Sequence, residues 1–229
     1  AGVVLHTCAV APGARTEVAF AALRAVRPGD AVDLNYIYAF EADAGPAAAR
    51  PVGAPGSEDP PRLAALIDTA LPPHPTALAG VTVHTRRFGP GPARPSGHAL
   101  AVAAVLARAA GPGRLVLLAA DVSEPGPLPG ASAAAIAQAL DWAASFRAPV
   151  VNISLTGPPN AALALVVRRI AARGVVIVAA VGNDGPRAPA PFRGHLRPRH
   201  RWCPPTMSAA RCGSEWLGSW SACHPAIVC

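Results

Sequence analysis

Three side chains of this sequence are of types that can move a proton or stabilise a developing negative charge. Asp68 follows the apolar run 63–67. His98 stands 30 positions later at the start of a helix of small residues, and Asn183 follows the apolar run 174–181. Imidazole takes and returns a proton at neutral pH because its unperturbed pKa is about 6.5. Taken singly, such residues are more often turn formers or solvated side chains, so their chemistry depends on whether the fold brings them together.

The segments that contain these residues resemble, in order and spacing, the signature blocks of the subtilisin-like serine peptidases, the subtilase family. LAALIDT at 63–69, with the downstream His74-Pro75, is similar to the aspartate block of the family. PSGHALAVAA at 95–104 is similar to the histidine block. VVNISLTG at 150–157, followed by GVVIVAAVGNDG at 174–185, is the most specific match. The resemblance covers about residues 62–186.

The resemblance implies a role for each of the three side chains. Asp68 would accept a hydrogen bond from the imidazole of His98 and fix its tautomer, and His98 would act as the general base. Asn183 would donate a hydrogen bond in the oxyanion hole, where one donor typically contributes about 2.7–4 kcal/mol to stabilisation of the transition state. Ser154, Leu155 and Gly157 resemble the strand edge that pairs with an extended substrate. A polypeptide substrate is the partner that this implies.

Three positions depart from the pattern of the family. Ala70 stands where the family usually has glycine after the aspartate, which predicts a tighter turn. Ala99 and Leu100 replace the usual glycine and threonine after the histidine, which puts close packing beside the base in question.

The nucleophile block of the family, Gly-Thr-Ser-Met-Ala, is absent from the sequence. The segment 206–210, TMSAA, resembles it superficially, but the order differs and no glycine precedes it. Only 25 residues separate Asn183 from Ser208. A triad needs an activated hydroxyl aligned with the histidine and the oxyanion donor, so Ser208 is not expected to be a nucleophile. The function that the resemblance implies is a serine-type endopeptidase, inactive as written. The alternative is a non-catalytic, truncated pseudo-peptidase or peptide-binding fragment.

The order of apolar and helical segments predicts an α/β fold. Strands are expected at 63–67, 115–122, 150–155 and 175–181, and helices at 97–109, 131–145 and 160–173. This alternation indicates a doubly wound parallel sheet, which the resemblance identifies as the subtilisin type, incomplete at its C-terminus. Because the strands are continuously apolar, both faces of the sheet should be covered. Functional residues of such sheets gather at the carboxyl ends of the strands.

The chain divides into four segments by composition. Residues 1–43 predict a small α+β piece, with a strand at 2–10, a helix at 16–26 and a strand at 31–39; it is interpreted as a propeptide remnant or a packed accessory subdomain. The segment 44–61 is a Pro/Gly-rich linker. Residues 62–189 are a partial subtilisin-like peptidase domain. The tail 190–229 is rich in Arg, Trp and Cys and lacks periodicity, so we interpret it as a reading-frame change or chimeric terminus, with a divergent natural tail as the alternative.

Composition argues against several other classes of protein. The net charge is +7, but all 20 basic residues are arginine, which indicates coding bias rather than a nucleic-acid-binding face. Without lysine there is no P-loop, and GPGP at 89–92 does not fit a dinucleotide fingerprint. No uncharged apolar run of about 18 residues could span a membrane. No signal peptide is visible; a secreted or periplasmic location is implied by the family alone. The sequence gives no oligomeric state.

No metal or cofactor site is identifiable in the sequence. The five cysteines follow no CxxC pattern, and no short ligand spacing connects the candidate ligands of the tail. These candidates are His195, His200, Cys203, Cys212, Cys223 and His224.

Overall fold

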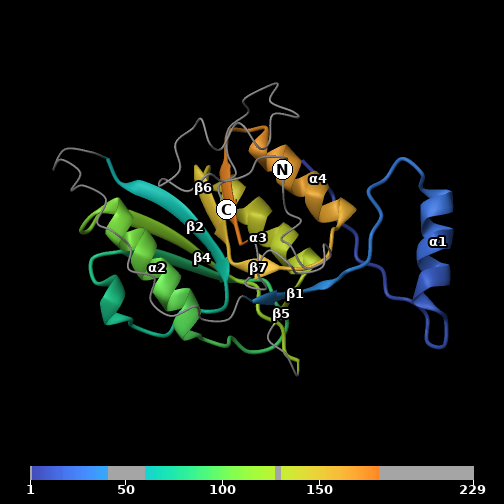
Figure 1. Ribbon diagram of the computed structural model, residues 1–229, viewed down its shortest axis with the longest axis horizontal. Helices are drawn as coiled ribbons and strands as arrows, with labels where there is room; N and C mark the ends of the chain where they lie inside the picture. Colours follow the sequence, from blue (N-terminus) through green and yellow to red (C-terminus); the bar gives the residue numbers. More distant parts are fainter. Residues whose placement is uncertain (1, 41–59, 127–129, 181–229) are drawn as a thin grey trace, which may run out of the picture.

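The computed structural model describes residues 2–40, 60–126 and 130–180. Its main element is a parallel sheet with the strand order β3-β4-β2-β6-β8 (Figure 1). The strands are β2 (Arg62–Asp68), β3 (Thr82–Arg87), β4 (Leu115–Asp121), β6 (Val150–Ile153) and β8 (Val176–Ala179). Asp68 and Asp121 lie opposite each other at the ends of β2 and β4. The carboxyl ends of the central strands therefore meet at one edge of the sheet.

Helices cover both faces of this sheet. The helix α2 (Gly97–Ala110) and the short 3-10 helix η1 (Thr76–Leu78) pack on one face, and α3 (Ala133–Ser145) and α4 (Ala161–Ala171) pack on the other. Leu66 and Leu117 belong to the core on the α2 side, whereas Ile67 and Leu118 belong to the core on the α3 side. Because successive residues of one strand point to opposite faces, continuous apolar runs are required. The predicted doubly wound α/β fold is confirmed.

Side-chain caps fix where the helices begin. Ser96, Ser132 and Asn160 precede α2, α3 and α4, and each accepts a hydrogen bond from a backbone N–H of the first turn. Such caps satisfy donors that have no partner within the helix. The cap at Ser132 leaves residues 130–132 free to form a strand, so α3 begins two residues after its predicted start.

A second, antiparallel sheet joins the N-terminal segment to the main body. Its strands are β1 (Ile37–Phe40), β5 (Gly130–Ser132) and β7 (Leu155–Thr156), in the order β5-β1-β7 (Figure 1). In the register, Tyr38 faces Ala131 and Phe40 faces Leu155. The predicted strand 31–39 is therefore shorter than expected and pairs with the main body.

In the part of the chain that it describes, the structure confirms one predicted helix, lacks one predicted strand and contains one strand that was not predicted. The helix α1 (Thr16–Val26) has its predicted bounds, but it buries none of its residues and stands apart from the sheet in Figure 1. The predicted strand at 2–10 is wrong: these residues form no regular element. An apolar run becomes a strand only beside a partner, and the described residues supply none here. The strand β3 was missed because its sequence, TVHTRR, contains few apolar residues and lies at an exposed edge.

The remaining segments are described only in part. The linker 44–61 falls almost entirely outside the described residues, although β2 begins at Arg62, where the linker was expected to end. The tail 190–229 lies wholly outside them. Among the helices that the structure describes, none is both long and apolar enough to cross a membrane.

Candidate functional site

Asp68 and His98 meet at the carboxyl end of β2. The imidazole Nδ1 of His98 lies 2.9 Å from Oδ2 of Asp68. The side chain of Asp68 is 1% exposed, whereas that of His98 is 22% exposed. A buried carboxylate thus holds one ring nitrogen of an imidazole that is partly exposed to solvent.

Two hydroxyl groups connect the strand that carries the acid to the helix that carries the imidazole. The Thr69 backbone N–H donates to Oδ1 of Asp68 at 2.7 Å, and the Thr69 hydroxyl donates to the same oxygen at 3.3 Å. Thr69 Oγ1 and Ser96 Oγ are 2.5 Å apart. Ser96 Oγ also accepts from the Ala99 N–H at the first turn of α2. Sequence reasoning assigned no role to these hydroxyls, although a serine two residues before the helix histidine is a recognisable cap signal.

The three departures from the pattern of the family are accommodated. Ala70 is buried, has no positive φ, and its carbonyl accepts from the Ser96 N–H at 3.2 Å. Ala99 is fully buried, and Leu100 packs against the core on the α2 side. The methyl and isobutyl groups therefore fill space beside the histidine without displacing it from Asp68.

A second buried carboxylate lies at the end of the neighbouring strand β4. Asp121 pairs with the guanidinium of Arg87 and accepts from the Ser123 hydroxyl at 2.6 Å and its N–H at 3.0 Å. Arg87 also donates to the carbonyls of Pro90 at 2.6 Å and Gly91 at 2.7 Å. The charge of Asp121 is thereby matched, and the loop that leads to α2 is clamped. This cluster was not predicted, because β3 was not recognised as a strand.

The strand edge that was expected to bind substrate is occupied by β1. Leu155 pairs with Phe40 in an antiparallel ladder, and the neighbouring residues of β7 and β1 continue it. Leu155 is fully buried and Ser154 is 8% exposed. The Ser154 hydroxyl accepts from the side-chain amide of Asn152 at 2.9 Å. The backbone of this edge thus pairs with an extended segment of the same chain.

Tyr38 is the buried anchor of β1. Its ring lies against Gly157, where an added Cβ would be 2.5 Å from the ring. Its hydroxyl donates to the carbonyl of Pro158 at 2.8 Å. Burial, followed by the negative charge of Asp33 and the proximity of Tyr36, raises the pKa of Tyr38 well above its ordinary value of 10.0. The phenol is therefore held in its neutral, donating form.

Two side chains that precede β1 bind the N-termini of the helices. Asp33 Oδ2 accepts from the Ala161 N–H of α4 at 2.6 Å, and Asn35 Oδ1 accepts from the Ala134 N–H of α3 at 2.9 Å. Helix N-termini offer unpaired N–H groups and a partial positive charge, so a carboxylate and an amide oxygen are suitable partners. Sequence reasoning missed both contacts, because the partners lie 128 and 99 positions apart.

Asp68 and His98 are thus the two predicted catalytic residues that the structure brings together. Asn183, the predicted oxyanion donor, and Ser208 lie outside the described residues. Ser154, Leu155 and Gly157 lie in or directly beside β7, which pairs with β1. Within the described residues, no three His, Cys, Asp or Glu side chains are grouped in a way that could hold a metal ion.

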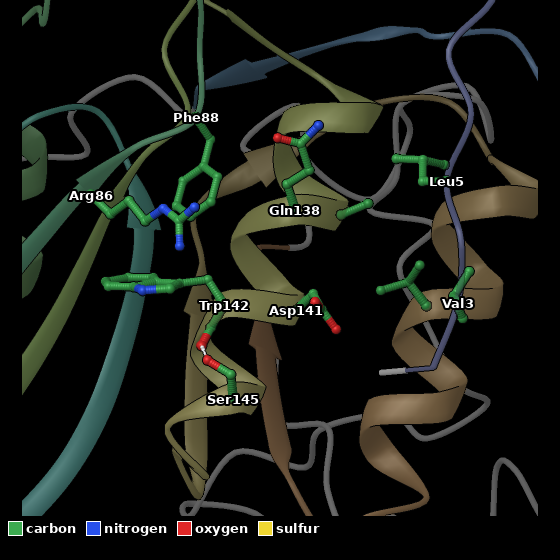
Figure 2. Close-up of a pocket in the computed structure, with 10 residues that line it drawn as sticks. Val3, Leu5, Arg86, Phe88, Gln138, Asp141, Trp142 and Ser145 are labelled. Carbon is green, nitrogen blue, oxygen red and sulfur yellow. Dashed lines mark hydrogen bonds between the residues drawn. The ribbon is translucent and has the colours of Figure 1, made fainter.

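A pocket of about 380 Å³ lies elsewhere, between α3, the end of β3 and the N-terminal segment (Figure 2). Figure 2 shows Phe88 and Trp142 on one side, with their rings 5.7 Å apart, and Val3 and Leu5 on the other. The lining does not include Asp68 or His98. The chemistry of the acid and imidazole is therefore located outside this pocket.

A model of the subtilase family matches residues 74–199. This match includes His98, Asn183 and the edge 154–157, and it begins after Asp68. A comparison with curated proteins gives no match.

Three solved structures are similar to this chain, each with a TM-score of 0.44. The prenylagaramide maturation protease PagA is 19% identical, and the match covers 56% of this chain and 48% of PagA. For a mutant of the protease domain of PatA, these values are 18%, 57% and 54%. For the nisin leader peptidase NisP from Lactococcus lactis, they are 18%, 55% and 45%. The chain spans about half the length of the structures it matches.

Proposed function

This chain belongs to the subtilase family, and on that premise we propose that it carries the acid–base half of a serine endopeptidase centre. Asp68 is the orienting acid, His98 is the general base, and Asn183 is the oxyanion donor. The observation that carries the proposal is the 2.9 Å contact between His98 Nδ1 and the buried Asp68 carboxylate. The substrate of the whole protein is a polypeptide.

The contact between His98 and Asp68 supports base catalysis because it involves Nδ1 and leaves Nε2 as the basic nitrogen. With Nδ1–H donated to Asp68, Nε2 is the ring nitrogen whose lone pair takes a proton from a hydroxyl nucleophile. The carboxylate then stabilises the imidazolium that forms. Because Oδ1 of Asp68 is already engaged by Thr69, the acid presents its other oxygen to His98. The side chain of His98 is 22% exposed, whereas that of Asp68 is 1% exposed.

We further propose that the chain of 229 residues binds peptides without hydrolysing them. No Gly-Thr-Ser-Met-Ala block occurs in it, and TMSAA at 206–210 does not have the same order. An oriented imidazole without a serine hydroxyl cannot form an acyl intermediate.

A fluorophosphonate probe, which labels activated serines, tests the missing nucleophile. We expect no labelling of the folded chain and no cleavage of an added unfolded polypeptide. Labelling that disappears in a Ser208→Ala variant, but persists in a Ser145→Ala control, would show that Ser208 is activated and that the proposal is wrong.

The endopeptidase proposal for the whole protein is tested at the level of the gene. The coding DNA from the codon of Asn183 onward is sequenced and translated in all three frames. A Gly-Thr-Ser-Met block in another frame would support an active peptidase lineage. Its absence from every frame would favour a serine-less relative that binds peptides.

A second function is supported by the position of β1. We propose that residues 31–40 act as an internal occupant of the peptide-binding edge, which agrees with the interpretation of residues 1–43 as a propeptide remnant. β1 lies between β5 and β7 as an extended substrate would. Asp33 and Asn35 fasten it to α4 and α3.

Competition with an added peptide tests this occupancy. A labelled peptide with the sequence of residues 31–40 should bind the Asp33→Ala, Asn35→Ala chain at least about tenfold more tightly than the unaltered chain, because a tethered strand competes at a high effective concentration. Equal affinity for the two chains would rule out internal occupancy.

A further inference from the structure

We propose that the groove between β5 and β7 selects extended polypeptides by a tyrosine side chain, at the position that Tyr38 now occupies, and that the Pro158 carbonyl distinguishes tyrosine from phenylalanine. This inference rests on the proposed function of the edge 154–157 as a peptide-binding strand. It specifies which side chain of a bound peptide the protein prefers at this edge.

Gly157, directly after β7, makes room for the ring of Tyr38, and Gly130 on β5 lets the backbone of β1 approach closely. A Cβ added to Gly157 would lie 2.5–2.9 Å from three ring atoms of Tyr38. A Cβ added to Gly130 would lie 2.4 Å from the side chain of Ile37 and 3.0 Å from the carbonyl oxygen of Tyr38. Distances this short are incompatible with any larger residue unless the strand moves. The two glycines therefore set how closely the bound strand and its ring can approach.

The Pro158 carbonyl, at the end of the groove, accepts a hydrogen bond from the tyrosine hydroxyl. The Tyr38 hydroxyl donates to the Pro158 carbonyl at 2.8 Å, and Tyr38 is 2% exposed. A phenylalanine of nearly the same size would fill the groove but leave the carbonyl of the half-buried Pro158 without this donor. A neutral hydrogen bond typically contributes about 0.5–1.5 kcal/mol, and an acceptor that is partly shielded from solvent is not fully compensated by water when its donor is removed.

The side chains next to Tyr38 in the sequence are not buried and recognised as the Tyr38 ring is. Ile37 is 56% exposed and Ala39 is exposed, because successive side chains of a strand point to opposite faces. Tyr36 is half-buried, and its hydroxyl has no hydrogen-bond partner among the described residues. Recognition is thus concentrated at one side chain, and Tyr36 supplies a matched control within the same segment.

The test uses the full chain with Tyr38→Ala, which removes the anchor of its own β1, and three labelled peptides of residues 31–40. These carry the natural sequence, phenylalanine in place of Tyr38, or phenylalanine in place of Tyr36. We expect the first and third peptides to bind equally, and the second to bind about tenfold more weakly. A ratio below about threefold between the first and second peptides would overturn the proposed selection.

A second receptor variant keeps the test decisive if the Tyr38→Ala chain does not fold. The Asp33→Ala, Asn35→Ala chain keeps the groove and its own tyrosine but loses the two side-chain hydrogen bonds from the N-terminal segment to α4 and α3. The same ratio between peptides is expected with it. If the natural peptide and the Tyr38→Phe peptide bind this folded receptor equally, tyrosine selection is wrong while the peptide-binding edge stands. If no peptide binds either folded receptor, the peptide-binding edge itself is wrong.

Discussion

The contact of Asp68 with His98 and the docking of β1 against β7 are built in opposite ways. The first joins the end of a central strand to the start of the helix that packs on it, through side chains at most 30 positions apart. The second joins an N-terminal segment to loops and helix ends that lie about 90 to 130 positions later. The acid–imidazole pair thus belongs to the core of the parallel sheet, whereas β1 belongs to the separate antiparallel sheet with β5 and β7.

This difference predicts that the two regions have different stabilities. β2 is paired on both sides and buried on both faces, so it can open only when the sheet unfolds. β1 is held by short ladders, one buried ring and two helix caps, which can be released while the sheet remains folded. Local opening of this kind is common for segments with few buried contacts.

The largest effect is expected in the sheet itself. Ile67→Ala removes a fully buried side chain next to Asp68 and should lower the free energy of unfolding by about 2–5 kcal/mol, because it leaves a cavity in the core. Ile37→Ala on β1, where the side chain is 56% exposed, should change it by less than about 0.5 kcal/mol. Urea unfolding measures both values, and equal losses would contradict the comparison.

A smaller and local effect is expected at the groove. Gly157→Ala forces a methyl group into the ring of Tyr38, and overpacking of this kind typically costs about 1–3 kcal/mol. Amide hydrogen exchange should show loss of protection in β1 and β5, with β2 and β4 unchanged. Gly29→Ala is the matched control, since nothing lies within 4 Å of a Cβ there. Loss of protection throughout the sheet would show that the two regions do not open separately.

Alkaline pH should release β1 through Tyr38. The docked phenol has a pKa above 10.0, its value when released. Its contribution to docking is therefore fully present below about pH 10 and is lost as pH rises, by at most about 1.4 kcal/mol per pH unit. Limited proteolysis of the segment that contains β1 should accelerate as the pH rises above about 10. A Tyr38→Phe chain with the same acceleration would show that another group is responsible.

The smallest effect is expected at the hydroxyl bridge. Ser96→Ala removes the cap of α2 and the partner of the Thr69 hydroxyl, and should cost about 1 kcal/mol. Ser145→Ala, which removes a hydroxyl of an exposed residue at the end of α3, should cost less than about 0.5 kcal/mol. The comparison of urea midpoints decides whether the bridge contributes to stability beyond an ordinary hydroxyl.

The same contrast explains what could be read from the sequence. Asp68, His98 and the central strands were predictable because apolar runs and a local motif specify them. The role of Thr69 and Ser96 required the turn geometry between strand and helix. β3 and the Arg87–Asp121 pair were not predictable from a polar edge strand. The contacts of Asp33, Asn35 and Tyr38 depend on the tertiary fold, since no local pattern indicates partners about 100 residues away.

The tautomer of His98 tests the central proposal most directly. Nitrogen-15 chemical shifts of its ring, assigned with a His98→Gln variant, are compared between the unaltered chain and Asp68→Asn. We expect the neutral ring of the unaltered chain to carry its proton on Nδ1, and Asp68→Asn to shift the proton towards Nε2. A proton on Nε2 in the unaltered chain, or an unchanged tautomer in Asp68→Asn, would contradict the assignment of Asp68 as the orienting acid.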